Sequence, residues 1–123
     1  MAIMVVIIHG NIKTMEQQDY TDGYLCIEEG KISAVGPMTE FQEEQWLMGK
    51  EVQVIHAKGN LVMPGIIEAH CHMGITEEKK GMEGDDCNEN VNPITPYLRA
   101  IDAINPMDAA FDDALRAGVT GAM

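Results

Sequence analysis

Two histidines separated by one residue, His70 and His72, have the side-chain type and the spacing needed to hold a metal ion. They follow an apolar run, and alternate side chains of an extended strand face the same way. Both imidazoles would therefore lie on one face of the strand and Cys71 on the other. Paired neutral imidazoles suit a divalent transition metal, with zinc as the usual ion. The alternative is a chance pair whose rings only make hydrogen bonds, and the spacing alone leaves both interpretations open.

The segments around these histidines predict a strand followed by a long loop. Residues 66–70 form a compact apolar run after a Pro-Gly bend, which is typical of a buried strand. Residues 73–96 contain glycines, acidic residues and an Asn-Pro pair, with no clear hydrophobic period. This stretch is much longer than the roughly 4–6 residues of an ordinary connection, and loops of such length are often functional or disordered.

A helix and a second strand are predicted after the loop. Asn105 is a good N-cap, and Asp108 lies in the first turn, where the helix dipole favours a negative charge. Gly118 is placed to end the helix, and residues 119–123 resemble the start of another strand. The order strand, loop, helix, strand predicts one β-α-β unit with a parallel strand pair. The apolar stripe of the helix consists of Met107, Ala110, Phe111, Ala114 and Leu115.

The first sixty residues predict a small β meander, because turn signals recur at short intervals between runs of β-branched residues. Glu29-Gly30 fits a tight hairpin turn. Residues 39–48 interrupt the pattern with a threonine cap and spaced apolar residues, which predicts one short helix. The expected strands are residues 3–8, 24–28, 31–35 and 52–56.

The composition excludes several classes of partner. The chain has 123 residues, of which 46% are hydrophobic, and this suffices for one modest core. A net charge of −12 opposes broad contact with nucleic acid or anionic lipid. The three cysteines form no CxxC pair, so a reduced compartment fits best. The apolar start at residues 2–8 is too short to cross a bilayer and has no basic leader. We therefore expect a soluble, cytoplasmic protein without a nucleic-acid or membrane partner.

Several motifs occur in an order that is specific to one family. They are Gly30-Lys31-Ile32, Val35-Gly36, the segment from Val54 to Gly59, the segment from Val62 to His72, and Ala117-Gly118-Val119-Thr120. In this order they resemble the amino-terminal region of the amidohydrolase superfamily, most closely its imidazolonepropionase-like members. The resemblance implies a β-rich small domain at residues 1–62, which is part of a composite β-sandwich. Residues 63–123 would then be the first β-α-β unit of a (β/α)8 TIM-type barrel that is incomplete in this chain.

The resemblance also implies a function. His70 and His72 would be metal ligands on the first barrel strand, for one or two divalent ions, with zinc expected. The activity would be hydrolysis of non-peptide carbon-nitrogen bonds of cyclic amide or amidine type in a small molecule, by metal-activated water. The remaining ligands and the proton-transferring aspartate would lie beyond residue 123. The catalytic residue is therefore unknown, and this chain alone is expected to be inactive.

The acidic stretch at residues 77–89 would follow the first barrel strand, on the face where βα loops build active sites. Glu83, Asp85 and Asp86 are therefore candidates for substrate contact, although charge runs more often simply face water. The expected partner is a second copy of the chain or the remainder of its own barrel. An alternative from another class is a non-catalytic remnant that acts as a metal-binding or interaction module.

Overall fold

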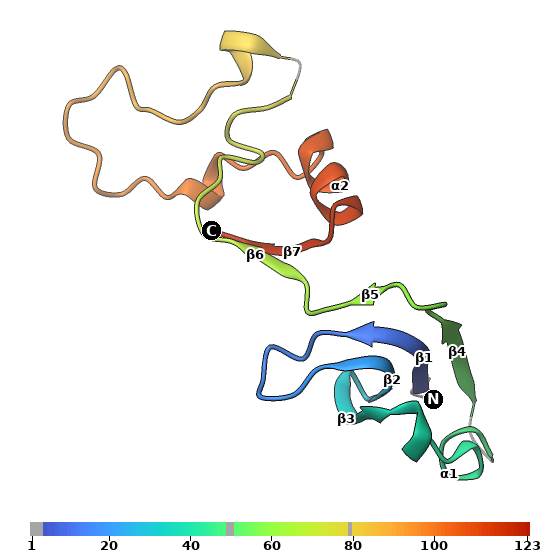
Figure 1. The fold of residues 1–123 in the computed structure, drawn as a ribbon. Helices are drawn as coiled ribbons and strands as arrows, with labels where there is room; N and C mark the ends of the chain where they lie inside the picture. The colour runs from blue at the N-terminus through green and yellow to red at the C-terminus, as the bar shows by residue number, and fades with distance from the viewer. Residues whose placement is uncertain (1–3, 49–50, 79) are drawn as a thin grey trace. The chain divides into compact units, whose positions relative to one another are not determined.

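The computed structural model describes residues 4–48, 51–78 and 80–123 (Figure 1). The chain divides into two compact units, Met1–Pro64 and Gly65–Met123. No helix within the described ranges is long and apolar enough to cross a membrane.

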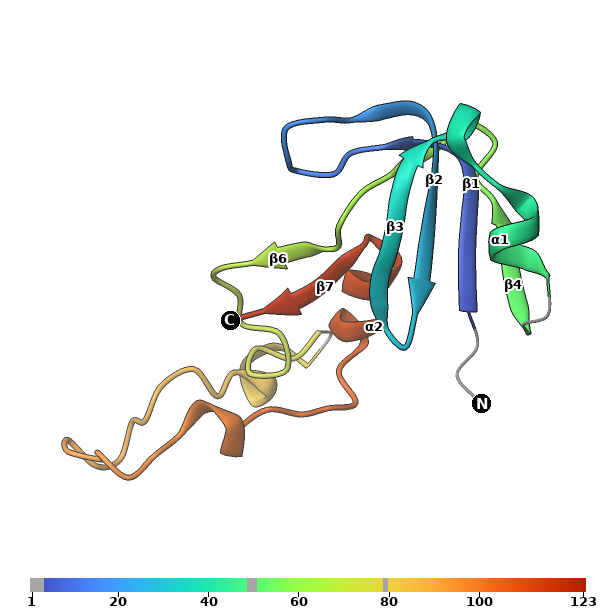
Figure 2. The same ribbon diagram turned by 90° about the horizontal axis from the view of Figure 1, so that it is seen from below.

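The first unit is a mixed five-stranded sheet with the order β3-β2-β1-β4, and β5 also pairs with β1. The pairs β1–β2 and β2–β3 are antiparallel, as a meander requires, whereas β4 and β5 run parallel to β1. The expected meander is thus correct only for the first three strands. A parallel neighbour needs a crossover, and the helical segment before β4 provides it (Figure 2). The strands are β1 (Met4–Ile12), β2 (Tyr20–Glu28), β3 (Lys31–Pro37), β4 (Val52–His56) and β5 (Leu61–Val62).

The four predicted strands of this unit are present in the structure. β1, β2 and β3 are longer than expected, β4 has the predicted bounds, and β5 was not predicted. The predicted start of the first strand at Ile3 lies outside the described residues. Glu29 and Gly30 have φ angles of 50° and 75° and join β2 to β3. Two consecutive positive φ angles are characteristic of the tight hairpin turn that suits strand twist, so the predicted hairpin is confirmed.

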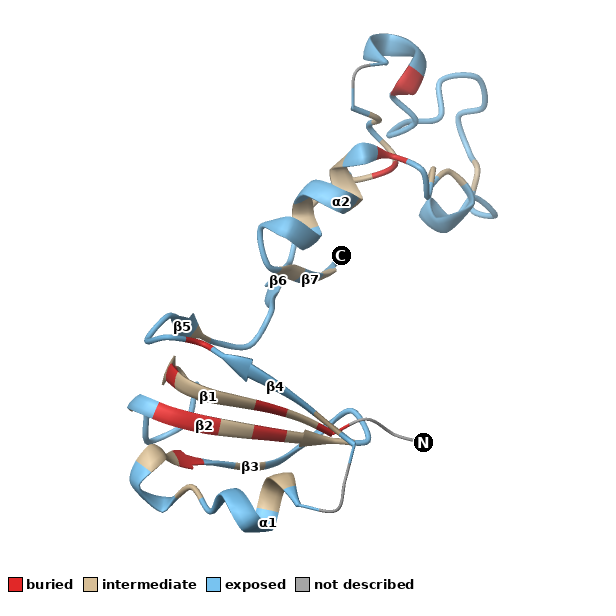
Figure 3. Ribbon diagram, turned by 90° about the vertical axis from the view of Figure 1, so that its right-hand side faces the viewer, coloured by how far each residue is buried: buried red, intermediate tan, exposed pale blue. Residues whose placement is uncertain are grey.

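The core of the first unit lies on one face of the sheet, where Met4, Val6, Tyr24 and Cys26 are buried (Figure 3). Half-buried side chains from the crossover, including Phe41 and Trp46, pack against this face. The single helix expected at residues 39–48 is in fact two pieces, η1 (Met38–Glu40) and α1 (Glu43–Leu47). The extended backbone at Phe41 separates them, and it places this ring beside Tyr24 with ring centroids 5.1 Å apart.

The second unit contains one β-α-β arrangement. Strands β6 (Ile66–Glu68) and β7 (Val119–Ala122) are parallel, as expected, and α2 (Ala109–Arg116) precedes β7. Two short 3-10 helices, η2 (Gly81–Gly84) and η3 (Ala100–Asp102), lie in the long loop. Strand β6 is exposed rather than buried, with Ile67 73% exposed, because β7 is its one neighbouring strand in the described chain.

Helix α2 begins later than predicted. Asp108 is the N-cap, and its side chain accepts a hydrogen bond from Ala110 N. Asn105, the expected cap, instead accepts a hydrogen bond from Met107 N at 3.0 Å, one turn earlier. Asn and Asp are both good N-caps. The helix begins at Asp108, whose carboxylate also accepts hydrogen bonds from Gly74 N and Glu78 N. Gly118 follows the helix with a φ of 87°, as predicted for its end.

Candidate metal centre

The carboxyl end of β6 carries the histidine pair, although the strand itself ends at Glu68. Backbone pairing with the end of β7 continues past that point. Met123 N donates to Glu68 O at 3.0 Å, and Cys71 N donates to Met123 O at 3.1 Å. His70 N also donates to the Glu68 carboxylate at 3.0 Å. The backbone that carries both histidines is therefore held beside β7.

The rings of His70 and His72 lie on the same side of this segment. Their centroids are 5.2 Å apart, and the two ring planes are inclined by 59°. Both residues are exposed. Two imidazoles bound to one tetrahedral zinc ion would have ring centroids roughly 5 Å apart, given Zn–N bonds of about 2.0–2.1 Å. The separation and the donor chemistry of the pair therefore fit two positions of a zinc shell.

The described residues do not supply a third ligand near this pair, since no group of three His, Cys, Asp or Glu side chains among them could hold a metal ion. The pair thus offers donor nitrogens for at most two of the four positions of a tetrahedral shell.

The other two histidines of the chain lie in the first unit. The rings of His9 and His56 stack with centroids 5.1 Å apart and planes inclined by 13°. His9 Nδ1 is also 3.0 Å from Asp22 Oδ1. These contacts give the two rings a role in joining β1, β2 and β4.

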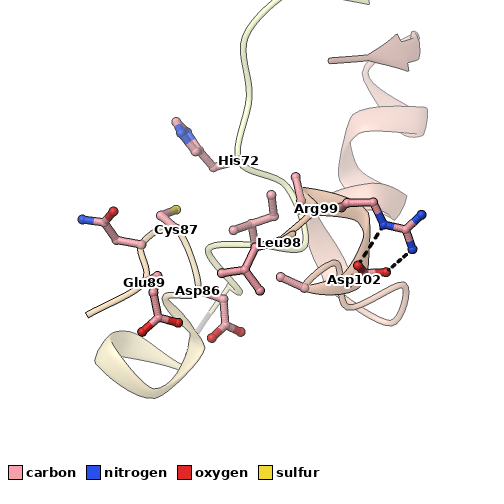
Figure 4. A pocket seen from close by; sticks show the side chains of 11 residues that line it. His72, Asp86, Cys87, Glu89, Leu98, Arg99 and Asp102 are labelled. Atoms are coloured by element: carbon pink, nitrogen blue, oxygen red, sulfur yellow. Dashed lines mark hydrogen bonds and ion pairs between the residues drawn. The ribbon is translucent and has the colours of Figure 1, made fainter. Parts of the chain in front are cut away.

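A cavity of about 410 Å³ lies beside His72 in the second unit (Figure 4). In Figure 4 the imidazole of His72 lies on one side of the cavity, and the carboxylates of Asp86 and Glu89 lie on the other. Further lining comes from apolar side chains, including Leu98, and from Arg99.

Three of the charged groups at this cavity are already engaged. Arg99 makes a bidentate ion pair with Asp102, with Nε–Oδ2 and Nη2–Oδ1 distances of 3.1 and 2.9 Å. Glu89 accepts hydrogen bonds from the backbone N–H groups of Asn92 and Val91, and these bonds lower the pKa of Glu89. The Asp86 side chain has no such partner among the described residues, so its carboxylate can contact a ligand.

The three acidic residues predicted to contact substrate have different surroundings. Asp86 lines the cavity together with His72, and its backbone N–H is fixed by a 2.9 Å bond to Ile75 O. Asp85 accepts a bond from Cys87 N at 3.2 Å and forms a β-bridge with Thr76. Neither Asp85 nor Glu83 lines this cavity.

Sequence reasoning missed Leu98, Arg99 and Asp102 as cavity residues. The Arg and Asp three residues apart are a common pattern for a local ion pair, and that pattern carries no information about a distant histidine.

Comparison with known proteins relates this chain to enzymes. No family model matches it. The amidohydrolase tasK of Hapsidospora irregularis is 30% identical over 105 residues, which is 82% of this chain and 10% of that protein. An imidazolonepropionase of Alkaliphilus metalliredigens is 40% identical over 52 residues, covering 42% of this chain and 12% of the relative. The 5-methylthioadenosine/S-adenosylhomocysteine deaminase of Clostridium tetani is 31% identical over 110 residues, 85% of this chain and 24% of the relative.

A solved structure gives the same relationship. An amidohydrolase from Thermotoga maritima superposes on 97% of this chain with a TM-score of 0.80 and 28% sequence identity, and the match covers 29% of that protein. The chain therefore spans about a tenth to a third of the length of these proteins. The chain is similar to members of the amidohydrolase superfamily, and its expected resemblance to the amino-terminal portion of that superfamily is confirmed. The β-rich unit with its mixed sheet matches an amidohydrolase amino-terminal domain.

Proposed function

We propose that this chain contributes the first part of a metal-dependent hydrolase that acts on non-peptide carbon-nitrogen bonds of a small molecule. The observation that carries the proposal is the pair of imidazole rings, 5.2 Å apart, at the carboxyl end of β6. The relatives support it, because their names describe amidohydrolases, imidazolonepropionase and deaminases. They do not favour the alternative of a non-catalytic module.

In this proposal His70 and His72 hold one or two divalent metal ions, with zinc as the expected ion. When bound, the ion would polarise a substrate carbonyl or imine and acidify water. The chain's own residues have separate tasks. The Glu68 carboxylate holds the backbone N–H of His70, and the pairing of Cys71 with Met123 keeps the two rings on one side.

The proposed architecture places this pair at the active face of a (β/α)8 barrel. The β6-α2-β7 arrangement is the first β-α-β unit of that barrel, and catalytic residues of such barrels lie at the carboxyl ends of the strands. Residues 1–62 would form part of a composite β-sandwich. The exposed faces of both units would be covered by the remainder of the barrel or by a second copy of the chain.

The cavity beside His72 suggests how a substrate would be oriented. Asp86 contributes a carboxylate, which can accept hydrogen bonds and has no partner among the described residues, and Leu98 contributes apolar surface. A cyclic amide or amidine offers N–H donors together with an apolar ring and would suit this lining. Asp86 is therefore the proposed substrate contact, and Glu83 and Asp85 stay predictions without support from the cavity.

The metal assignment is tested in the full protein by replacing His70 or His72 with Ala. Each variant should lose bound zinc, measured by atomic spectroscopy after gel filtration, together with hydrolysis of cyclic amides or amidines. His56→Ala removes a histidine outside the pair and should keep both. A double variant that is free of metal and active would refute the ligand assignment.

The substrate contact has its own test. Asp86→Asn should raise KM for the hydrolysed substrate by about tenfold with zinc content unchanged, because a hydrogen bond to a charged group contributes on the order of 1.5–3 kcal/mol. Asp112→Asn removes a negative charge from an exposed position outside the cavity and should leave KM unchanged. Equal KM values for wild type and Asp86→Asn would contradict this role.

A further inference from the structure

Among the described residues of the second unit, Asp108 is the charged residue that is buried, with 6% of its surface exposed. As the N-cap of α2 it needs to accept one hydrogen bond, and Oδ1 receives that bond from Ala110 N at 3.3 Å. The burial of a carboxylate is costly unless it is further hydrogen-bonded. The cap alone therefore does not explain why this side chain is buried.

Both oxygens of Asp108 also reach the segment that leaves His72. Oδ2 accepts a hydrogen bond from Gly74 N at 3.0 Å, and Oδ1 accepts one from Glu78 N at 3.2 Å. Burial alone would raise the pKa of Asp108. The three backbone N–H groups and the charge of Lys80 outweigh that effect and leave the pKa below its ordinary value of 3.8. The carboxylate is therefore charged when it holds this loop.

Gly74 is held at its other polar group as well. Its carbonyl accepts a hydrogen bond from Asn105 N at 2.8 Å, and its φ is 77°. A Cβ at this position would lie 3.0 Å from side-chain atoms of Ile104 and Phe111. The peptide two residues after His72 is thus fixed by hydrogen bonds on both sides and by close packing.

His72 depends on this turn for its position. Its carbonyl accepts hydrogen bonds from Ile75 N at 3.0 Å and from Thr76 N at 2.8 Å. Asp108 binds the backbone N–H groups that flank these two residues, those of Gly74 and Glu78. The imidazole itself contacts the ring of His70 and has no hydrogen-bond partner in the described parts of the chain. The backbone turn, and not a side-chain partner, therefore directs the His72 ring.

We propose that Asp108 is a positioning residue for His72, which holds the turn after β6 so that the ring stays beside His70. The proposal rests on the proposed function, in which His72 is a metal ligand. In many metal sites a hydrogen bond to the ring orients the histidine. Here Asp108, which lies 36 positions after His72 in the sequence, would orient it through the backbone. The chemical requirement is a carboxylate, because its two oxygens must accept from three N–H groups.

The variant Asp108→Asn separates this role from helix capping, because Asn is an equally good N-cap but offers one accepting oxygen. In the full protein we expect unchanged helix content by circular dichroism and about tenfold weaker zinc affinity, measured by competition with a chelating dye. Asp112→Asn removes the same charge from the exposed side of α2 and should leave the affinity unchanged. Wild-type affinity in a folded Asp108→Asn protein would overturn the proposal.

A second measurement uses the wild-type protein and does not depend on the folding of a variant. If Asp108 couples the turn to the ring, zinc binding should slow amide hydrogen exchange at Gly74 and Glu78, because coupling between two sites is reciprocal. Exchange that zinc leaves unchanged at both amides would overturn the positioning role.

Histidine variants distinguish the two proposals. If His72→Ala weakens zinc binding while Asp108→Asn does not, only the positioning role fails. If His70→Ala and His72→Ala both retain wild-type zinc affinity, the proposed metal pair fails and the role of Asp108 fails with it.

Discussion

The side-chain amide of Asn105 donates a hydrogen bond of 2.6 Å to Glu77 Oε2 and so joins the start of the long loop to the segment before α2. Glu77 is also 2.7 Å from Lys80 Nζ. Asp108 adds hydrogen bonds from Gly74 N and Glu78 N, so the start of the loop is tied to the segment around the beginning of α2. The two ends of the loop are thus joined directly after the histidine pair, and we call this joined region the loop neck.

The loop neck should loosen in acid. The hydrogen bond from Lys80, then that from Asn105, lowers the pKa of Glu77 below its ordinary value of 4.5, and the pKa of Asp108 is also lowered. A lowered folded-state pKa contributes stability that is present above the unfolded value and is lost as pH falls through the folded value. We expect the melting temperature of the second unit to fall below about pH 4.5.

Thermal melts from pH 7 to pH 3 measure this effect, and Glu77→Gln should flatten the acid limb of the curve. Glu83→Gln is the control, because it removes a carboxylate from an exposed position in the same loop. A wild-type acid limb in the Glu77→Gln protein would show that other carboxylates control the transition.

Two glycines of the second unit allow packing and backbone strain to be separated. Gly74 and Gly118 have φ angles of 77° and 87°, so Ala at either position adopts a strained backbone costing about 1–2 kcal/mol. A Cβ at Gly118 would meet nothing within 4 Å, whereas one at Gly74 would meet two side chains at 3.0 Å. Gly74→Ala should therefore lower the free energy of unfolding by more than Gly118→Ala, on the order of 1 kcal/mol more.

Urea unfolding monitored by circular dichroism provides this comparison. Equal losses for the two alanine variants would mean that Ile104 and Phe111 move aside without cost.

Residues 1–123 expressed alone should bind zinc weakly and show no amidohydrolase activity. His70 and His72 fill only half of a tetrahedral shell, and the described residues offer no third ligand close by. We expect zinc to be lost on dialysis, measured by atomic spectroscopy, and no turnover of cyclic amides with any added metal. Turnover that His70→Ala abolishes would contradict the prediction and would also exclude a contaminating enzyme.

The isolated chain should also self-associate. Exposed strands present unpaired backbone and apolar side chains, among them Ile32 at 65% and Ile67 at 73% exposure. Sedimentation velocity should show species larger than a monomer, and Ile67→Lys should reduce their fraction. Thr39→Lys adds the same charge at an exposed polar position and should not. A monomeric wild-type chain with a cooperative melt would contradict this expectation.

Local features of the fold could be predicted from the sequence. The Glu29-Gly30 hairpin, the first three strands and the end of α2 at Gly118 depend on neighbouring residues, whose backbone preferences act over a few positions. The i, i+2 spacing of His70 and His72 also predicted that the two rings would lie together. The strand β6 ends before them, however, and contacts from distant segments hold the turn that follows His72.

Tertiary structure decided the features that join distant segments. The parallel pairing of β4 with β1, the choice of Asp108 over Asn105 as the cap of α2, and the place of Asp86 across a cavity from His72 all depend on such contacts. Asn105 and Asp108 have equal propensity to cap a helix. No sequence periodicity indicates that Asp108 binds Gly74, which is 34 residues away. These contacts form only when loop closure is offset by burial and hydrogen bonding, which the whole chain determines.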